Sequence, residues 1–301
     1  MASEQLMQFS AEMRANYRAL IPSAGAPDPV AEIRAFTIAA ESPTRDIPIR
    51  LYSPETDAQA PSLPVVVFIH GGGWVSGDLD THHVLASAIA SRAHALVLSV
   101  DYRLSPEHPF PAGLDDTYAV LEWAANHAAE IGGDPARLAI AGDSAGGNLA
   151  AAASLLAHDR RGPNISAQWL MYPCVRNVLD TPSGQQRGDT YFPTRPAFEL
   201  CLACYLPPGG DPLSPLIAPF WGQHEGLPPT LLQAGTLDPL HDEGEAYISK
   251  LVSAGVKATW TSYPDAEHGF IQFFNDKATH PAGEPGLEEG IAFLIEQLDI
   301  R

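Results

Sequence analysis

Short, continuously apolar runs alternate with helical patterns along most of the chain, and this alternation limits the fold more than any other feature. The apolar runs end at Gly, Pro or Asp, as expected for strands buried on both faces of a parallel sheet. They cover 65–69, 96–100, 138–141, 169–172 and 231–232 with its flanks. Helical spacing occupies 83–93, 115–129, 145–158 and 242–254, with Asp115, Ser144 and Asp242 as expected helix starts. Such alternation predicts an α/β fold with right-handed crossovers.

Three further segments frame this alternating region. IRAFTIAA and IPIRLYSP predict two antiparallel edge strands ahead of the parallel ones. Residues 1–30 read as an amphipathic helix and a proline-rich stretch, and 174–226 as a long segment rich in proline and aromatic residues with one helix around Ala197–Tyr205. Segments this long without regular structure are usually functional. We expect a single domain over 1–301, with 1–30 and 174–226 as its cap; a docked or frayed terminus is the alternative for the first helix.

Composition limits the partners of the chain. Its 301 residues include 17 basic and 36 acidic ones, a formal charge of −19, which makes nucleic acid and anionic membranes poor partners. No window approaches the ~20 apolar residues of a membrane span, and the N-terminus lacks a secretory pattern, so we expect a cytoplasmic protein.

An odd number of cysteines in a large domain predicts buried, reduced thiols and no disulfide framework. A zinc site would need a second ligand pair beside the CxxC of residues 201–204, so no metal is expected.

The clearest motif is GDSAG at 142–146, between the strand RLAIA and a helical stretch. It fits G-x-S-x-G in the strand–turn–helix setting that this motif requires. We expect the turn to strain Ser144 and expose its hydroxyl, while Gly142 and Gly146 keep neighbouring side chains away. The start of the following helix favours negative charge there. A plain helix N-cap is the alternative interpretation of Ser144.

A serine hydroxyl is a weak nucleophile until a base removes its proton, and that base needs an orienting partner. Asp238 follows the strand TLLQAG, and His268 follows ATWTSYP, so both lie where open sheets place their sites. The order Ser, Asp, His is that of α/β-hydrolases. Asp242 and Asp265 are the alternative acids. Seven other histidines are expected at the surface: His82, His83, His94, His108, His127, His158 and His241.

Three glycines follow the apolar run PVVVFI in HGGGW at 70–74. Glycine lets the backbone turn sharply and approach a ligand closely. Acyl transfer passes through an oxyanion that backbone N–H groups stabilise, so we expect the amides of Gly72, Gly73 and Ala145 to form an oxyanion hole, with Gly71 shaping the turn. A phosphate-binding loop is disfavoured, because no GKS or GxGxxG follows and the next basic residue is Arg92.

Together these stretches resemble the bacterial hormone-sensitive-lipase-like carboxylesterases of family IV. The similar segments are HGGGW, DYRLSPEHPFPAGLDD, GDSAGGNLA, DPLHDEGEAY and HGF, in this order across residues 45–275. The resemblance implies an α/β-hydrolase fold: a mostly parallel eight-stranded sheet flanked by helices, with a helical cap. It also implies a Ser144–Asp238–His268 triad and hydrolysis of short-chain esters without a cofactor. In such proteins the segment around Glu107 and His108 is structural.

Our hypothesis is therefore a serine carboxylesterase that acts on small neutral esters of short to medium chain through an acyl-enzyme. Two alternatives stay open: a binding protein, since plant gibberellin receptors resemble this family without a complete triad, and an amidase or peptidase with the same chemistry. The sequence also leaves a homodimer open. A rigid, proline-rich roof with Trp74 and Phe198, Tyr205 or Trp221 is expected to enclose a small apolar pocket that favours about four to eight acyl carbons.

Overall fold

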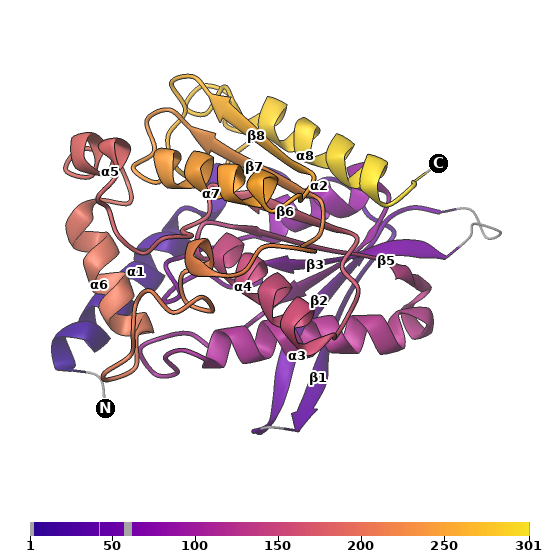
Figure 1. Ribbon diagram of the computed structural model, residues 1–301. Coiled ribbons are helices and arrows are strands. Elements are labelled where there is room, and N and C mark those ends of the chain that lie inside the picture. The colour runs from indigo at the N-terminus through magenta and orange to yellow at the C-terminus, as the bar shows by residue number, and fades with distance from the viewer. Residues whose placement is uncertain (1–2, 42, 57–61, 301) are drawn as a thin grey trace.

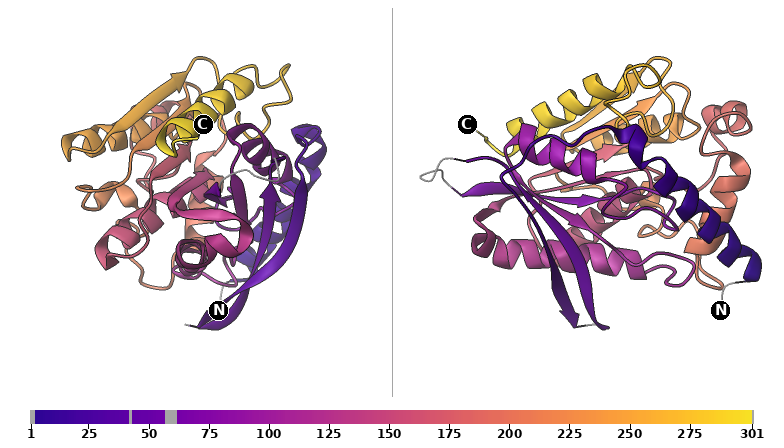
Figure 2. Two further views of the ribbon diagram at one scale, coloured as in Figure 1. Left: turned by 90° about the vertical axis from the view of Figure 1, so that its right-hand side faces the viewer. Right: turned by 180° about the vertical axis from the view of Figure 1, so that it is seen from behind.

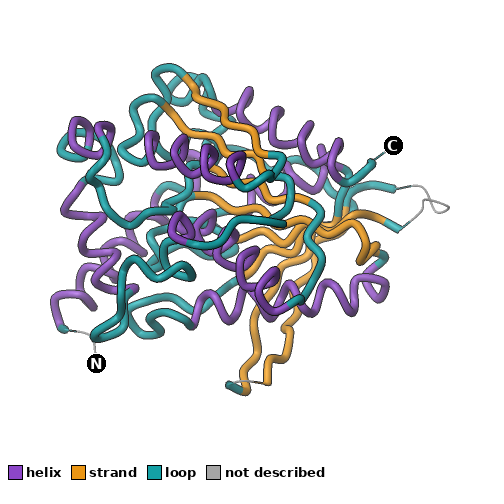
Figure 3. The backbone as a smooth tube through the Cα atoms, viewed as in Figure 1, coloured by secondary structure: helices purple, strands orange, loops and turns teal. Residues whose placement is uncertain are grey.

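The computed structural model describes residues 3–41, 43–56 and 62–300, which form an eight-stranded sheet with helices on both faces (Figures 1 and 3). The strands run in the order β1-β2-β4-β3-β5-β6-β7-β8, and only the pairs β1/β2 and β2/β4 are antiparallel. Their bounds are β1 Glu32–Glu41, β2 Thr44–Ser53, β3 Leu63–Ile69, β4 Leu96–Val100, β5 Gly133–Asp143, β6 Ala167–Met171, β7 Thr230–Gly235 and β8 Ala258–Tyr263.

Every predicted strand overlaps an observed one, and the mostly parallel sheet is confirmed. One detail was wrong: β2 is not an edge strand, because it pairs with β1 on one side and with β4 on the other. The β1–β2 hairpin extends beyond the body of the sheet (Figure 1). In the part of the chain that the structure describes, no helix is long and apolar enough to cross a membrane.

The predicted helices are also present, with shifted ends and some additions. Neither Asp115 nor Asp242 starts a helix, because α3 begins after Pro111 and α7 after Leu240. Two helices, α5 and α8, were not predicted from the local pattern. The helices are α1 Glu4–Ala19, α2 His83–Ala93, α3 Ala112–His127, α4 Ala145–Arg160, α5 Pro182–Arg187, α6 Arg195–Tyr205, α7 His241–Ser253 and α8 Gly283–Gln297, with short 3-10 turns at Ile21–Ala24, Ala128–Ile131 and Pro219–Trp221.

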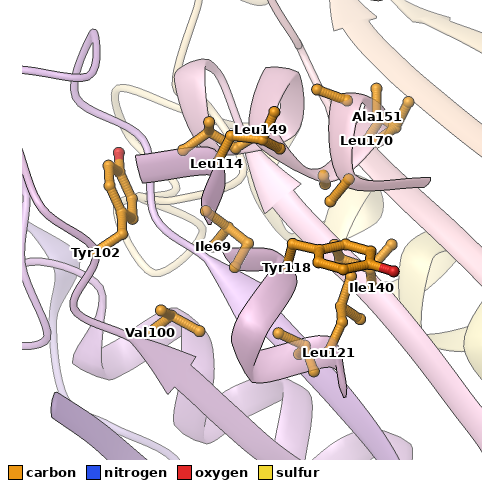
Figure 4. Close-up of a cluster of buried hydrophobic side chains, with 14 of the residues drawn as sticks. Ile69, Val100, Tyr102, Leu114, Tyr118, Leu121, Ile140, Leu149, Ala151 and Leu170 are labelled. Carbon is orange, nitrogen blue, oxygen red and sulfur yellow. The ribbon is translucent and has the colours of Figure 1, made fainter. Parts of the chain in front are cut away.

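Two apolar layers fix the sheet between its helices. One face packs against α3, α4 and α7, and the other against α2 and α8. On the first face, Leu114 and Leu121 of α3 meet Ile69 and Ile140 of the central strands (Figure 4). The central strands are buried on both sides, and this is why their sequences read as unbroken apolar runs. All three cysteines are free and buried, as predicted.

Helices α1, α5 and α6 gather beyond the carboxyl ends of the parallel strands, and α1 and α6 lie side by side (Figures 1 and 2). They belong to the two segments that the sequence sets apart from the alternating region. Residues that follow β3, β5, β6 and β8 share one cavity with α1. The fold therefore brings the predicted site residues to one end of the sheet, beneath these helices.

Candidate active site

Ser144 occupies the sharp turn between β5 and α4. Its backbone has φ 54° and ψ −119°, a conformation that costs energy for a residue with a side chain. The hydroxyl makes no capping hydrogen bond to α4, which argues against the plain N-cap interpretation. The turn is possible because a Cβ at Gly142 would lie 2.6 Å from the carbonyl carbon of Gly146, too close for any side chain.

The structure brings Ser144, His268 and Asp238 into one hydrogen-bonded line. Nε2 of His268 lies 2.8 Å from Oγ of Ser144, and Nδ1 lies 2.7 Å from Oδ2 of Asp238. The Asp238 carboxylate is fully buried, and its Oδ1 accepts a hydrogen bond from the amide of Leu240. A carboxylate only accepts, so Nδ1 of His268 carries a hydrogen and Nε2 is left with a lone pair toward the serine. This arrangement can remove a proton from the Ser144 hydroxyl.

The two alternative acids are engaged elsewhere. Oδ2 of Asp242 accepts from the amide of Ser183, and its Oδ1 lies 2.8 Å from Nδ1 of His241. Asp265 is exposed, and its amide donates to Oγ1 of Thr236. Of the three carboxylates, all described by the structure, Asp238 alone contacts His268.

The glycine turn after β3 faces the same hydroxyl. Gly72 and Gly73 have φ of 120° and 62°, and both line the cavity that contains Ser144. Positive φ values of this kind favour glycine. Among the described residues, none accepts a hydrogen bond from the amides of Gly72, Gly73 or Ala145. These N–H groups are therefore available to an oxygen atom that develops negative charge in the cavity.

A buried polar network behind this turn was not predicted. Asp143, which precedes Ser144, accepts from the amide of Gly71 at 2.7 Å, and Nε2 of His82 lies 3.1 Å from the same carboxylate oxygen. Burial alone would raise the pKa of Asp143, but His82 and the Gly71 amide bring that pKa below its ordinary value. The network thus keeps a carboxylate charged beside Ser144, and it holds the amide of Gly71 at the start of the glycine turn.

The expected surface position of His82 was wrong, since its side chain is completely buried. Its neighbours are the hydroxyls of Thr81 and Tyr17, at 2.9 and 3.2 Å from its ring nitrogens. The position precedes α2, and only tertiary packing turns it inward. The other six histidines are at least partly accessible.

A cavity of about 270 Å³ opens above the serine. Its wall is mostly apolar and comes from helix α1, the segment before α6, and the residues that follow β3, β5, β6 and β8. The lining residues beyond the predicted ones are Met13, Asn16, Tyr17, Leu20, Ser76, Asp143, Tyr172, Phe192, Gly269, Gln272 and Phe273. The ring of Phe192 lies 5.7 Å from that of His268, and the ring of Tyr172 lies 4.9 Å from it on another side.

The aromatic residues expected to enclose this cavity do not line it. Trp74 stacks on Tyr205 at 4.5 Å and donates from Nε1 to Asn148, so both rings belong to the core. Phe198 is buried in the same core, and Trp221 lies at the surface with 39 % exposure. The expectation was wrong because composition shows which side chains are large and apolar, but not which way they point. Phe192 and residues of helix α1 line the cavity instead.

One group of side chains has the spacing of metal ligands. Ligand atoms of His241, Asp242 and Glu245 lie within 4.8 Å of one another. Both ring nitrogens of His241 are already engaged, by Asp242 and by the hydroxyl of Ser262, and Glu245 is exposed. None of these three residues lines the cavity that contains Ser144, so the group takes no direct part in chemistry at the serine.

Comparison with known proteins places this geometry in a family. A family model described as alpha/beta hydrolase fold matches residues 66–272. Carboxylesterase NlhH of Mycobacterium tuberculosis is 43 % identical over 258 residues, which cover 84 % of this chain and 79 % of that protein. Carboxylic ester hydrolase LipN of the same organism is 38 % identical, over 87 % of this chain and 70 % of its own.

Solved structures of esterases also resemble this chain over nearly its whole length. EstE1, a thermophilic carboxylesterase cloned from a metagenomic library, matches with a TM-score of 0.89 and 34 % identity over 99 % of this chain and 98 % of its own. An ester hydrolase from the metagenome of Lake Arreo has a TM-score of 0.90 and 32 % identity over 97 % and 91 %. The chain belongs to the α/β-hydrolase family, in its hormone-sensitive-lipase-like branch.

Proposed function

We propose that this protein is a serine carboxylesterase in which Ser144, His268 and Asp238 act as the catalytic triad. Oγ of Ser144 attacks the ester carbonyl carbon while Nε2 of His268 takes its proton. The carbonyl oxygen becomes an oxyanion that accepts hydrogen bonds from the amides of Gly72, Gly73 and Ala145. As the tetrahedral intermediate collapses, His268 protonates the leaving alkoxide, and an acyl-enzyme and a free alcohol result.

The second half of the reaction repeats these steps with water. His268 removes a proton from water, the hydroxide attacks the acyl carbon, and the new oxyanion occupies the same amides. Collapse returns the proton to Oγ of Ser144 and releases the carboxylic acid. Asp238 keeps the imidazole in the productive tautomer and stabilises its cationic form throughout. No atom in this cycle requires a cofactor.

The observation that carries the proposal is the unbroken line from Asp238 through His268 to Ser144, with 2.7 and 2.8 Å between the atoms. The gibberellin receptors that resemble this family lack a complete triad, whereas here all three members are in contact. The relatives named as carboxylesterases support ester hydrolysis in particular.

The cavity supports small, uncharged esters as substrates. Its apolar wall offers no cation to an anionic substrate, and the formal charge of −19 disfavours anionic partners in general. A volume of about 270 Å³ accommodates short to medium chains. We place α1 and the segment 174–226 as the cap of the site, because α1 and Phe192 supply its outer wall.

A hydrolysis screen tests the proposal. p-Nitrophenyl esters with two to sixteen acyl carbons, roughly the range over which such pockets discriminate, are assayed beside matched p-nitroanilides. We expect ester hydrolysis with a maximum between about four and eight carbons, no comparable anilide hydrolysis, and loss of activity in Ser144→Ala. A fluorophosphonate probe should label Ser144. Preferential anilide cleavage would favour the amidase alternative, and labelling of another serine would overturn the triad.

A further inference from the structure

Helix α1 forms one wall of the substrate cavity although it is weakly packed. Met13, Tyr17 and Leu20 line the cavity, yet Ser10 is the one fully buried residue of the sixteen in the helix. Burial of apolar surface is the main source of packing energy, and Leu6, Phe9 and Met13, which pack against the core from this helix, are only partly buried. Its position must depend strongly on specific polar contacts.

Arg14 makes more of those contacts than any other residue of the helix that the structure describes, ahead of Tyr17 and Arg18. Its Nε donates to the carbonyl oxygen of Val75 at 2.8 Å, and Nη2 donates to the carbonyl oxygen of Ser105 at 3.0 Å. Nη1 and Nη2 also donate to the two carboxylate oxygens of Glu107, each at 2.7 Å. One planar guanidinium thus joins α1 to two separate loops. Its rigid fork of N–H donors can reach both carbonyl groups and the Glu107 carboxylate at once. The ammonium group of a lysine is a single point and cannot contact all three together.

Both loops are tied to the glycine turn. The amide of Val75 donates to the carbonyl oxygen of Gly72 at 3.2 Å, and the amide of Ser105 donates to that of Trp74 at 2.9 Å. Arg14 therefore binds the carbonyl groups of the two residues, Val75 and Ser105, whose own amides bond to the glycine turn and to Trp74 behind it. Arg14 thus links α1 on one side of the cavity to the Gly72–Gly73 turn on the other.

The geometry points to Arg14 as a specificity-determining positioning residue, which fixes the width of the substrate pocket by clamping α1 to the oxyanion turn. This inference rests on the proposed esterase function and deepens it. Arg14 does not line the cavity and touches no reacting atom. Without the clamp, α1 moves outward at Met13, Leu20 at its end moves with it, and longer or bulkier groups fit.

Arg14→Ala is compared with Arg18→Ala, a matched change on the same helix. The Arg18 side chain is 58 % exposed. It forms an ion pair with Asp78 and does not hold the carbonyl groups that Arg14 binds. Steady-state kinetics on p-nitrophenyl butyrate, octanoate and decanoate give KM and kcat separately. In Arg14→Ala, kcat/KM for decanoate relative to butyrate should rise about fourfold for each further methylene that the pocket admits, mainly through KM. Arg18→Ala should keep the wild-type ratio.

Glu107→Gln refines the test, because it removes charge from the pair but leaves both carbonyl contacts of Arg14. We expect a smaller shift than in Arg14→Ala. Arg14→Lys keeps the positive charge without the fork and should give an intermediate shift; it also replaces Arg14→Ala if that variant does not fold.

Hydrogen–deuterium exchange of residues 4–19 provides a readout that does not need activity. Exchange should be faster in Arg14→Ala or Arg14→Lys than in wild type and Arg18→Ala. Unchanged exchange, or equal effects on all esters, would overturn the clamp. A wild-type protein that hydrolyses no ester would refute the proposed function instead, while the exchange experiment would still decide whether Arg14 holds the helix.

Discussion

Adding a single methyl group at Gly146 should damage the site more than it damages the fold. Gly146 lies in the first turn of α4, against the end of β3. A Cβ at this position would lie 2.6 Å from the carbonyl oxygen of His70 and 2.7 Å from its carbonyl carbon, and it would also meet the carbonyl oxygen of Ile69. All three are backbone atoms, so no side chain can rotate to relieve the contact.

The required movement can be worked out from these contacts. Real Cβ atoms stay at least 3.0 Å from such neighbours, so the contact with His70 alone requires a shift of 0.4 Å (3.0 minus 2.6). That shift separates α4, which carries the Ala145 amide, from the strand that leads into the glycine turn. Overpacking of this kind costs about 1–3 kcal/mol, and alanine in a helix recovers up to about 1 kcal/mol.

The loss of activity should be larger, because misplacement by about 1 Å can cost roughly 100-fold in rate. We expect Gly146→Ala to lose at least about tenfold in kcat/KM on p-nitrophenyl butyrate, with a net loss of about 1–2 kcal/mol in unfolding free energy from denaturant titration. Gly113→Ala is the control, since its Cβ would come no closer than 3.1 Å, to the ring of Tyr102. Wild-type kinetics in Gly146→Ala would refute the reasoning.

Three further predictions concern buried charges. Asp238→Asn should lower kcat by up to about 10⁴-fold, since the imidazole loses its orienting carboxylate, whereas the exposed Asp265→Asn should change kcat little; the reverse would contradict the assignment. Burial raises the pKa of Glu243 to about 8, so the folded protein holds a proton that the unfolded chain releases at the lower, ordinary pKa. Unfolding free energy, measured by denaturant titration, should therefore fall as pH rises toward 8, by at most about 1.4 kcal/mol per pH unit, and Glu243→Gln should remove that part of the slope. His82→Phe leaves the Asp143 carboxylate without its ring donor and should lower unfolding free energy by about 1.5–3 kcal/mol; a thermal melt that matches wild type would exclude a structural role for this contact.

Prediction from the sequence succeeded where local pattern and chemistry coincide. The central strands are buried on both faces, so each appears as an uninterrupted apolar run. The turn at Ser144 was predictable because only small residues fit around it, and a Cβ at Gly142 would meet the backbone of Gly146. In both cases the constraint acts within a few neighbouring residues.

Prediction failed where the constraint comes from distant parts of the chain. Helix α8 contains glycines at 283, 286 and 290, which weaken a helical pattern. Gly290 is explained by the fold, because a Cβ there would overlap the indole ring of Trp169 on β6. Likewise, Trp74 follows the glycine turn in sequence, but its stacking on Tyr205 of α6 turns it into the core. No local pattern contains that information.

The same long-range packing explains how a negative charge is tolerated next to the proposed oxyanion site. Asp143 lines the cavity beside Ser144, and an uncompensated carboxylate there would oppose the developing oxyanion. The Tyr17 hydroxyl donates to Oε1 of Gln272 at 2.8 Å, so its oxygen offers only lone pairs to Nε2 of His82, and the Asp143 carboxylate offers only lone pairs as well. Nε2 of His82 therefore carries a hydrogen, which draws the charge of Asp143 away from the cavity. Because Tyr17 belongs to α1, the helix that walls the pocket also helps to fix the electrostatics of the site.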